Sequence, residues 1–371
     1  MSSTSSSTPI QMDRFSLFRL PTVAISEIMK MYDLLEITLL SMCSKRSCRW
    51  IKAFRVRRNA LEMGVVSYKD KTVNLYNESE KQKLRFIITS PMSQEMHESV
   101  KIGDLVYQMK PKETQEDEYH ENCTVYPISM YTENRIEGLK VLSEYLCSLF
   151  EVDINGVRIL EYLNLNDQIE VMKWVTKRQK RFQNLSFDSS RMNDTTAEYV
   201  FSKINEIERV HISFEASRGF KTNFKFEGRG LSLHRSHWFT IDNLLNINSS
   251  KLHVNESKLT NKDMNSILKH WMSSDLKFKY MHISMMEEVR IDDLFDGIPF
   301  EERTNNVRRV YRDSLGPTTI SGGYDIPGVC GTEFGIPKNS EISRFFGTKF
   351  RSEYSEAKIS ERNSDRNIPS Q

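Results

Sequence analysis

The feature that most constrains the fold of this chain is a repeated alternation of short strands and helices between about residues 137 and 286. Six segments there have the apolar–polar–apolar pattern of a strand, and they begin at Val152, Leu185, Val210, Leu231, Leu252 and Met281. Successive first residues lie 33, 25, 21, 21 and 29 positions apart. Helical stripes fill the gaps, with capping boxes predicted at Thr260–Asp263 and Thr195–Glu198. Strand–helix units of this length are typical of a leucine-rich-repeat-like stack.

Two architectures remain open for this region. In a leucine-rich-repeat-like body, each unit stacks on its neighbours because it cannot bury its own apolar face. In a compact α/β fold, the same alternation builds a parallel sheet. The short spacings favour the first architecture, so we predict the fold class α+β/α/β, with three N-terminal helices and an irregular leucine-rich-repeat-like strand–helix body.

Changes of texture along the chain predict its domain boundaries. The N-terminal leader is Ser/Thr-rich, the next segment is helical, and a β-rich segment precedes the strand–helix body. The C-terminal segment is Ser-rich and charged, which predicts mobility, and a possible strand near Thr319–Ile326 precedes it. The predicted parts are a disordered leader at 1–12, helices at 13–58, β-structure at 60–135, the body at 136–326 and a mobile tail at 327–371.

The three helices predicted near the N-terminus carry more apolar surface than such short helices can cover for one another. Pro21 suits the start of a helix, and Asp33 with Glu36 forms a capping-box variant before the next one. Apolar residues recur at helical spacing through this segment. An exposed apolar helical face of this kind indicates a protein partner.

Charge and composition exclude several classes of protein. The 371 residues include 52 Lys and Arg against 50 Asp and Glu, a net charge of +2, so the chain has no global attraction to nucleic acid or acidic membranes. No segment approaches the ~18 apolar residues of a membrane span, and the first residues lack the features of a signal peptide. Five scattered cysteines do not form a disulfide framework. They indicate reduced thiols, and we expect a cytoplasmic or nuclear location.

Motifs of enzyme chemistry are missing from the sequence. It contains no glycine-rich phosphate loop and no nucleophile elbow, so we predict no catalytic residue, no enzyme activity and no cofactor. His234 and His237 are three apart but lack further ligands nearby, so we predict no metal site. His211, His253 and His282 each occupy the polar position of a predicted strand. That pattern favours a solvated sheet face over a pH-sensitive binding surface.

A basic stretch near the N-terminus raises the hypothesis of a nucleic-acid-binding protein. No acidic residue lies between Ile37 and Leu61. Clustered Lys and Arg bind phosphates, and Trp50 with Phe54 could stack on bases. Both aromatic residues also fit the core face of a helix, which is the interpretation that we favour. The basic residues of the stretch are Lys45, Arg46, Arg49, Lys52, Arg55, Arg57 and Arg58.

Two parts of the sequence resemble known families. The segments Phe15–Pro21, Asp33–Ile37 and Cys43–Arg46, with Ile28 and Leu39–Ser41, resemble the F-box of nematode proteins. The remaining segments are similar to the nematode F-box-associated domain of the second type. They are Trp238–Ile247, Ser250–Leu252, Leu259–Asn265, Leu268–Trp271, Gly297–Phe300 and Gly322–Ile326.

The resemblance implies the substrate-recognition subunit of a Skp–cullin–F-box ubiquitin ligase. Such a subunit would bind the Skp adaptor, and through it a cullin, while the larger body presents a surface to a target protein. Spaced apolar anchors suit a helix that docks in a groove. On this resemblance, the adaptor-binding residues are Leu20, Pro21, Ile25, Ile28, Leu35 and Leu39. The residues that bind the target are not identified.

A second hypothesis is a protein-interaction scaffold outside any ligase. The family often has Leu-Asp-Pro where this chain has Tyr32, Asp33 and Leu34. A degenerate F-box of this kind would leave the body able to bind a partner without recruiting the adaptor.

Overall fold

The structure is a computed structural model of the chain. It describes residues 17–54, 61–90, 98–118, 120–160, 165–190, 192–273, 278–313, 316–327, 332–336 and 344–351. Contacts divide the chain into two compact units, Met1–Arg235 and Ser236–Gln371, hereafter unit 1 and unit 2. The predicted leader lies outside the described residues, as do the beginning of the F-box-like segment and Arg55, Arg57 and Arg58.

Unit 1 begins with the three predicted helices. A short 3₁₀ turn, η1 (Leu17–Arg19), precedes α1 (Thr22–Met31), α2 (Leu34–Cys43) and α3 (Lys45–Phe54). The capping box predicted before α2 is confirmed. The Asp33 Oδ1 atom accepts a hydrogen bond from the Glu36 backbone N–H at 2.7 Å, and Glu36 Oε2 accepts one from the Asp33 N–H at 2.9 Å.

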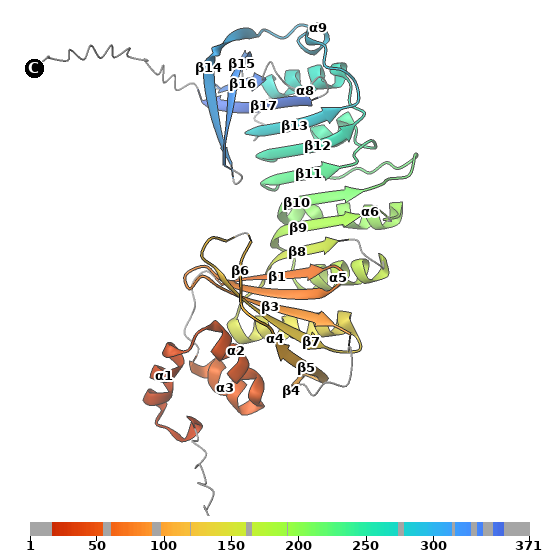
Figure 1. The fold of residues 1–371 in the computed structure, drawn as a ribbon. Helices are drawn as coiled ribbons and strands as arrows, with labels where there is room; N and C mark the ends of the chain where they lie inside the picture. Colours follow the sequence, from red (N-terminus) through yellow and green to blue (C-terminus); the bar gives the residue numbers. More distant parts are fainter. Residues whose placement is uncertain are drawn as a thin grey trace, which may run out of the picture. The chain divides into compact units, whose positions relative to one another are not determined.

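One mixed sheet forms the body of unit 1 (Figure 1). Its strands pair in the order β4–β5–β7–β3–β2–β1–β8–β9–β10–β11, and the short β6 pairs with β7. The strands are β1 (Leu61–Ser67), β2 (Lys71–Asn77), β3 (Gln82–Thr89), β4 (Glu98–Ile102), β5 (Leu105–Pro111), β6 (Gln115–Glu116), β7 (Thr124–Tyr131), β8 (Ile154–Leu160), β9 (Phe182–Ser189), β10 (Ile207–Phe214) and β11 (Gly230–His234). Strand β1 pairs with β8, so one sheet spans the boundary predicted at 135/136.

The predicted alternation of strands and helices is present. Strands β8, β9, β10 and β11 run parallel and follow the order of the chain. Between them come α5 (Leu165–Arg178), then α6 (Asp194–Phe201) with the turn η2 (Ile204–Glu206), and finally a loop in place of a helix. A mixed α/β fold is therefore established, while the leucine-rich-repeat-like architecture stays a prediction.

Helices cover one face of this sheet. Helix α4 (Arg135–Phe150) buries Leu139, Leu142 and Leu146, and α5 and α6 lie on the same side of the strands (Figure 1). The strands send alternate residues, such as Val65, Val157, Leu185 and Ile212, into this layer, where each is nearly fully buried. The other residues of each strand form a face without helices, which we call the open face.

Unit 2 continues with strands, helices and a C-terminal meander. Its helices are α7 (Ile241–Leu245), α8 (Asn261–Ser273) and α9 (Ile291–Leu294). Its strands are β12 (Lys251–Ser257), β13 (Tyr280–Met285), β14 (Glu301–Asp313), β15 (Gly316–Pro327), β16 (Thr332–Ile336) and β17 (Arg344–Arg351). Strand β12 runs parallel to β13, and β13, β17, β16, β15 and β14 pair antiparallel in that order.

This meander bears on two expectations from the sequence. Strand β15 contains the possible strand near Thr319–Ile326. Strands β16 and β17 lie within the segment 327–371, for which the sequence predicts a mobile tail. No helix in the described part of the chain is long and apolar enough to cross a membrane.

Candidate functional site

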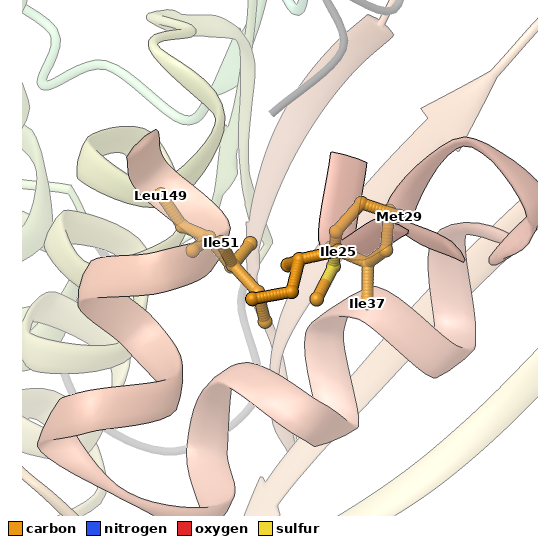
Figure 2. Close-up of a cluster of buried hydrophobic side chains, with 5 residues drawn as sticks. All are labelled: Ile25, Met29, Ile37, Ile51 and Leu149. Carbon is orange, nitrogen blue, oxygen red and sulfur yellow. The ribbon is translucent and has the colours of Figure 1, made fainter. Parts of the chain in front are cut away.

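The N-terminal helices share their hydrophobic core with the body of unit 1. Ile25 and Met29 of α1, Ile37 of α2 and Ile51 of α3 pack with Leu149 of α4 (Figure 2). All five side chains are at most 6% exposed. The fifth member of the cluster thus comes from a helix that also covers the sheet.

Polar contacts reinforce this junction. The Tyr145 hydroxyl donates a hydrogen bond to Ser41 Oγ at 2.6 Å, and Lys52 Nζ donates one to Ser148 Oγ at 2.6 Å. Burial raises the pKa of the Tyr145 phenol, so this hydroxyl keeps its proton and remains a donor. The sequence predicts a partner for the excess apolar surface of the three helices, but α4 of the same chain covers part of that surface.

The outer side of α1 retains exposed apolar residues. Val23 is 75% exposed and Met31 is 83% exposed. They are eight positions apart in one helix, which places them on the same side with Glu27 between them. We call Pro21, Val23 and Met31 the outer α1 surface; Pro21 is also exposed.

The six predicted adaptor-binding residues differ in how far their side chains are buried. Ile25 is fully buried in the shared core, so in this conformation its side chain offers no surface to a partner. Pro21 is exposed, and the others are half-buried: Leu20, Ile28, Leu35 and Leu39. The structure brings them into one helical unit, while their role in adaptor binding stays a prediction.

Val23 and Met31 are absent from the residues predicted to bind the adaptor. The apolar stripe of α1 is wide enough to include both faces of the helix, and its spacing alone does not separate the inner face from the outer one. The i, i+4, i+8 series of Val23, Glu27 and Met31 is the signal for an outer face, because it carries a charge in its middle.

The basic helix α3 combines exposed charges with a stack of rings. Lys45, Arg46 and Arg49 are exposed. The ring of Trp50 stacks on Phe18 at 6.0 Å and on Phe54 at 5.3 Å between centroids, and all three rings are half-buried against the helical core. The favoured interpretation of Trp50 and Phe54, packing in a helical core, therefore agrees with their contacts.

Of the three histidines predicted on one sheet face, His253 and His282 are neighbours in unit 2, whereas His211 in unit 1 lies beside His234. In unit 1 the rings of His211 and His234 lie 4.8 Å apart, and in unit 2 those of His253 and His282 lie 4.3 Å apart. His234 ends β11 and His237 follows in a turn, so the two do not share a helix face. Within the described ranges, no group of three or more His, Cys, Asp or Glu side chains is placed to hold a metal ion.

The described cysteines are free thiols with different surroundings. Cys43 is exposed, Cys48 is half-buried, and Cys123 and Cys147 are buried. Burial raises the pKa of Cys147 to about 11, and its Sγ atom lies 3.5 Å from Met63 Sδ of β1. A buried thiol that keeps its proton is a packing group rather than a nucleophile.

Comparisons with known proteins place part of the chain in a family context. Residues 219–283 match the family model described as "F-box associated". These residues run from the loop before β11 to β13 and include the segments Trp238–Ile247 and Leu259–Asn265, on which the resemblance rests. The match does not extend to α1, α2 and α3.

A curated relative supports the same context. The Skn-1 dependent zygotic transcript 15 protein of Caenorhabditis elegans is 28% identical over 141 residues, which cover 36% of this chain. The matched part spans about 40% of the length of that relative. No solved structure matches the chain. The findings support a nematode type of protein with an F-box-associated domain.

Proposed function

We propose that this chain is a substrate-recognition subunit of a Skp–cullin–F-box ubiquitin ligase, in which α1, α2 and α3 bind the Skp adaptor. The F-box-associated match supports the proposal, because that domain family accompanies F-box proteins. The observation that carries it is the outer α1 surface, where Val23 and Met31 remain exposed on a helix that buries Ile25 and Met29 in the shared core.

The energetics favour a partner for this surface. Burying a Val or Met side chain contributes roughly 1.5–3 kcal/mol relative to leaving it exposed. Two such residues about two turns apart on one side of a helix are the spaced anchors that a helix uses in an apolar groove. Pro21 extends the surface at the start of the helix. A Skp adaptor that buries these side chains would gain affinity from both.

The proposal assigns recognition rather than chemistry to the chain. Ubiquitin transfer would take place on other subunits, so no residue of this chain needs to act as a catalyst and no cofactor is needed. The body would bind a target protein and the helical unit would bring that target to the cullin.

The test measures capture of purified Skp adaptor by the full chain. The variant Val23→Ser with Met31→Ser should lower adaptor affinity at least tenfold. The matched control is Val106→Ser with Met286→Ser, which removes one exposed Val and one exposed Met elsewhere and should bind like wild type. Circular dichroism should show unchanged folding for both variants, because all four side chains lie at the surface.

The outcomes separate the two hypotheses of function. Failure of the wild-type chain to bind adaptor would refute the ligase proposal. Capture of another cellular protein by such a chain would favour the scaffold hypothesis, which predicts partner binding without the adaptor.

A further inference from the structure

The open face of unit 1 has a row of side chains that the strand registers define. Neighbouring strands place Asn74, Gly64, Gly156, Asn184 and Arg209 opposite one another, on β2, β1, β8, β9 and β10. Arg158 lies two residues further along β8, on the same face. We call these six residues the open strip.

The middle of the open strip is bare backbone. A Cβ atom added at Gly64 would have the Gly156 carbonyl oxygen as its nearest described neighbour, at 3.9 Å, and the three atoms nearest to one at Gly156 all belong to Asn184, at 3.6 Å or more. A small side chain would therefore fit at either position without a clash. Glycine inside a strand weakens it, and it often marks a site where another backbone approaches closely.

Positive charge flanks this bare floor. Arg158 and Arg209 are exposed on the face, and Arg158 makes no hydrogen bond or ion pair with any residue that the structure describes. Arg209 Nε donates to Asn184 Oδ1 at 2.7 Å, which holds its guanidinium over β9 and β10. The row of Gly64 and the row of Arg158 contain no carboxylate. The nearest carboxylates along these strands are Glu62, in the row before that of Gly64, and Asp188, in the row after that of Arg158.

A folded-over segment borders one end of the strip. Residues 112–118 and 120–123 lie against the open face at β2 and β3, where Lys83 Nζ lies 2.6 Å from the buried Asp117 Oδ2. The ring of His120 packs on Tyr76 at 4.3 Å between centroids. Asn74 lies beside this segment, and its Oδ1 atom is shielded from water without a hydrogen bond from any described residue. This segment thus borders the strip at its Asn74 end.

From these features we infer that the open strip binds an extended acidic peptide segment of the target protein. Five strands at about 4.8 Å spacing span roughly 19 Å, which accommodates about six residues of extended chain. The glycines give room for the peptide backbone, and Arg158 and Arg209 pair with its carboxylates. That this peptide belongs to a target protein rests on the proposed function, whereas peptide binding itself does not need the adaptor.

The side chains of the strip favour a peptide over single-stranded nucleic acid. Sheet surfaces that bind single strands stack bases on aromatic rings. The rows of Gly64 and Arg158 contain no Phe, Tyr or Trp across the strands from β3 to β11. The one aromatic ring in these two rows is that of His211, beside His234. Two arginines with a single histidine in these rows fit carboxylates on a peptide better than a chain of bases.

The experiment selects peptides from a displayed library of random 12-residue sequences on the full chain. The selected peptides should be enriched in Asp and Glu. The variant Arg158→Glu with Arg209→Glu should weaken their binding at least tenfold. The matched control, Lys177→Glu with Lys180→Glu, makes the same charge change at exposed lysines on and after α5, and it should bind like wild type. The variant Gly64→Val should also weaken binding at least tenfold while the chain stays folded.

Several results would overturn the inference. They are an absence of selected peptides, peptides without acidic residues, or equal binding by the Arg158→Glu and Arg209→Glu chain. Tighter binding of a 12-nucleotide single-stranded RNA, lost in the same arginine variant, would also overturn it in favour of nucleic acid. Adaptor capture is measured on every variant. If it persists while peptide binding fails, only this inference falls, and if the reverse holds, only the proposed function falls.

Discussion

The outer α1 surface and the open strip belong to the same unit, yet their chemistry is opposite. The first presents Val23 and Met31 to water, and the second presents arginines, asparagines and bare glycine backbone. An apolar surface gains by staying covered, whereas a polar strip is stable in water and can exchange ligands. The difference suits a lasting partner at the helices and a transient one at the sheet.

Helix α4 packs against the elements that carry these two surfaces, the N-terminal helices and the sheet, on the sheet face opposite the open strip. Leu149 near its end completes the core of the N-terminal helices, while Cys147, two residues earlier, contacts Met63 of the sheet. One helix therefore packs against both. Variants of α4 should affect both regions, and variants of either outer surface should affect only one.

The largest expected effect comes from removing the shared core residue. Leu149→Ala should lower the free energy of unfolding by about 2–5 kcal/mol, because it leaves a cavity among fully buried side chains. Urea unfolding followed by tryptophan fluorescence and by circular dichroism measures the loss. Leu245→Ala, at a residue that is 41% exposed, is the control and should cost much less. Unchanged stability of the Leu149→Ala chain would mean that the helices and the body do not share a core.

The next effect is a pH dependence that originates on the sheet side of α4. The ordinary pKa of a cysteine thiol is 9.0, and burial raises the pKa of Cys147 to about 11. Between these values the unfolded chain loses the proton while the folded chain keeps it, so stability falls as pH rises from about 9 to 11. The loss amounts to roughly 2–3 kcal/mol at most.

Paired unfolding curves isolate this contribution. The stability difference between wild type and Cys147→Ala should shrink across pH 9 to 11. A difference that stays constant over this pH range would contradict the burial of Cys147.

A smaller effect on stability is expected from alanine substitutions that compare Gly64 of the strip with Gly228 outside it. A Cβ at Gly228 would lie 2.4 Å from the Ile207 carbonyl oxygen, so Gly228→Ala should destabilise by about 1–3 kcal/mol. Gly64→Ala has open space and a strand backbone, so its stability should change by less than about 0.5 kcal/mol or rise. Thermal unfolding compares the two. Equal losses would mean that Gly64 is required by packing rather than left for a ligand.

The smallest effect on stability is expected at the outer α1 surface. Val23→Ser with Met31→Ser should change the free energy of unfolding by about 0.5 kcal/mol or less, since both side chains already face water. Differential scanning calorimetry on the isolated chain measures this. A large loss would show that these residues support the fold, and it would weaken their assignment to a partner.

The parts of the fold that the sequence predicted are those with local signals. The strands beginning at Leu185, Val210, Leu231, Leu252 and Met281 all lie within β9 to β13, because one-sided burial forces alternation. The capping box at Thr260 is confirmed, with its N–H donating to Asp263 Oδ2 at 2.8 Å. The box predicted at Thr195 is wrong, since Asn193 caps α6 two residues earlier and accepts from Thr196 N–H at 2.9 Å. Asn and Thr are both favourable N-cap residues, so residue type alone does not identify which of them begins the helix.

Long-range pairing was less predictable. Strands β16 and β17 occur where the sequence predicts a tail. Their own residues show no clear strand periodicity, and the pairing with β15 and β13 that forms them cannot be read from local sequence. The covering of the N-terminal helices by Leu149 is a similar case. The open strip also escaped prediction, since the alignment of Gly64 with Gly156 depends on a register between distant strands.

Leu149 also sets a time order for synthesis. It follows Phe54, the end of α3, by 95 residues. At about 5–20 residues per second, the ribosome needs roughly 5–20 s to extend the chain from the third helix to the residue that closes the core. During that interval the apolar sides of α1, α2 and α3 have no fifth member to pack against. A nascent chain of this protein therefore offers a chaperone a binding window that ends when α4 emerges.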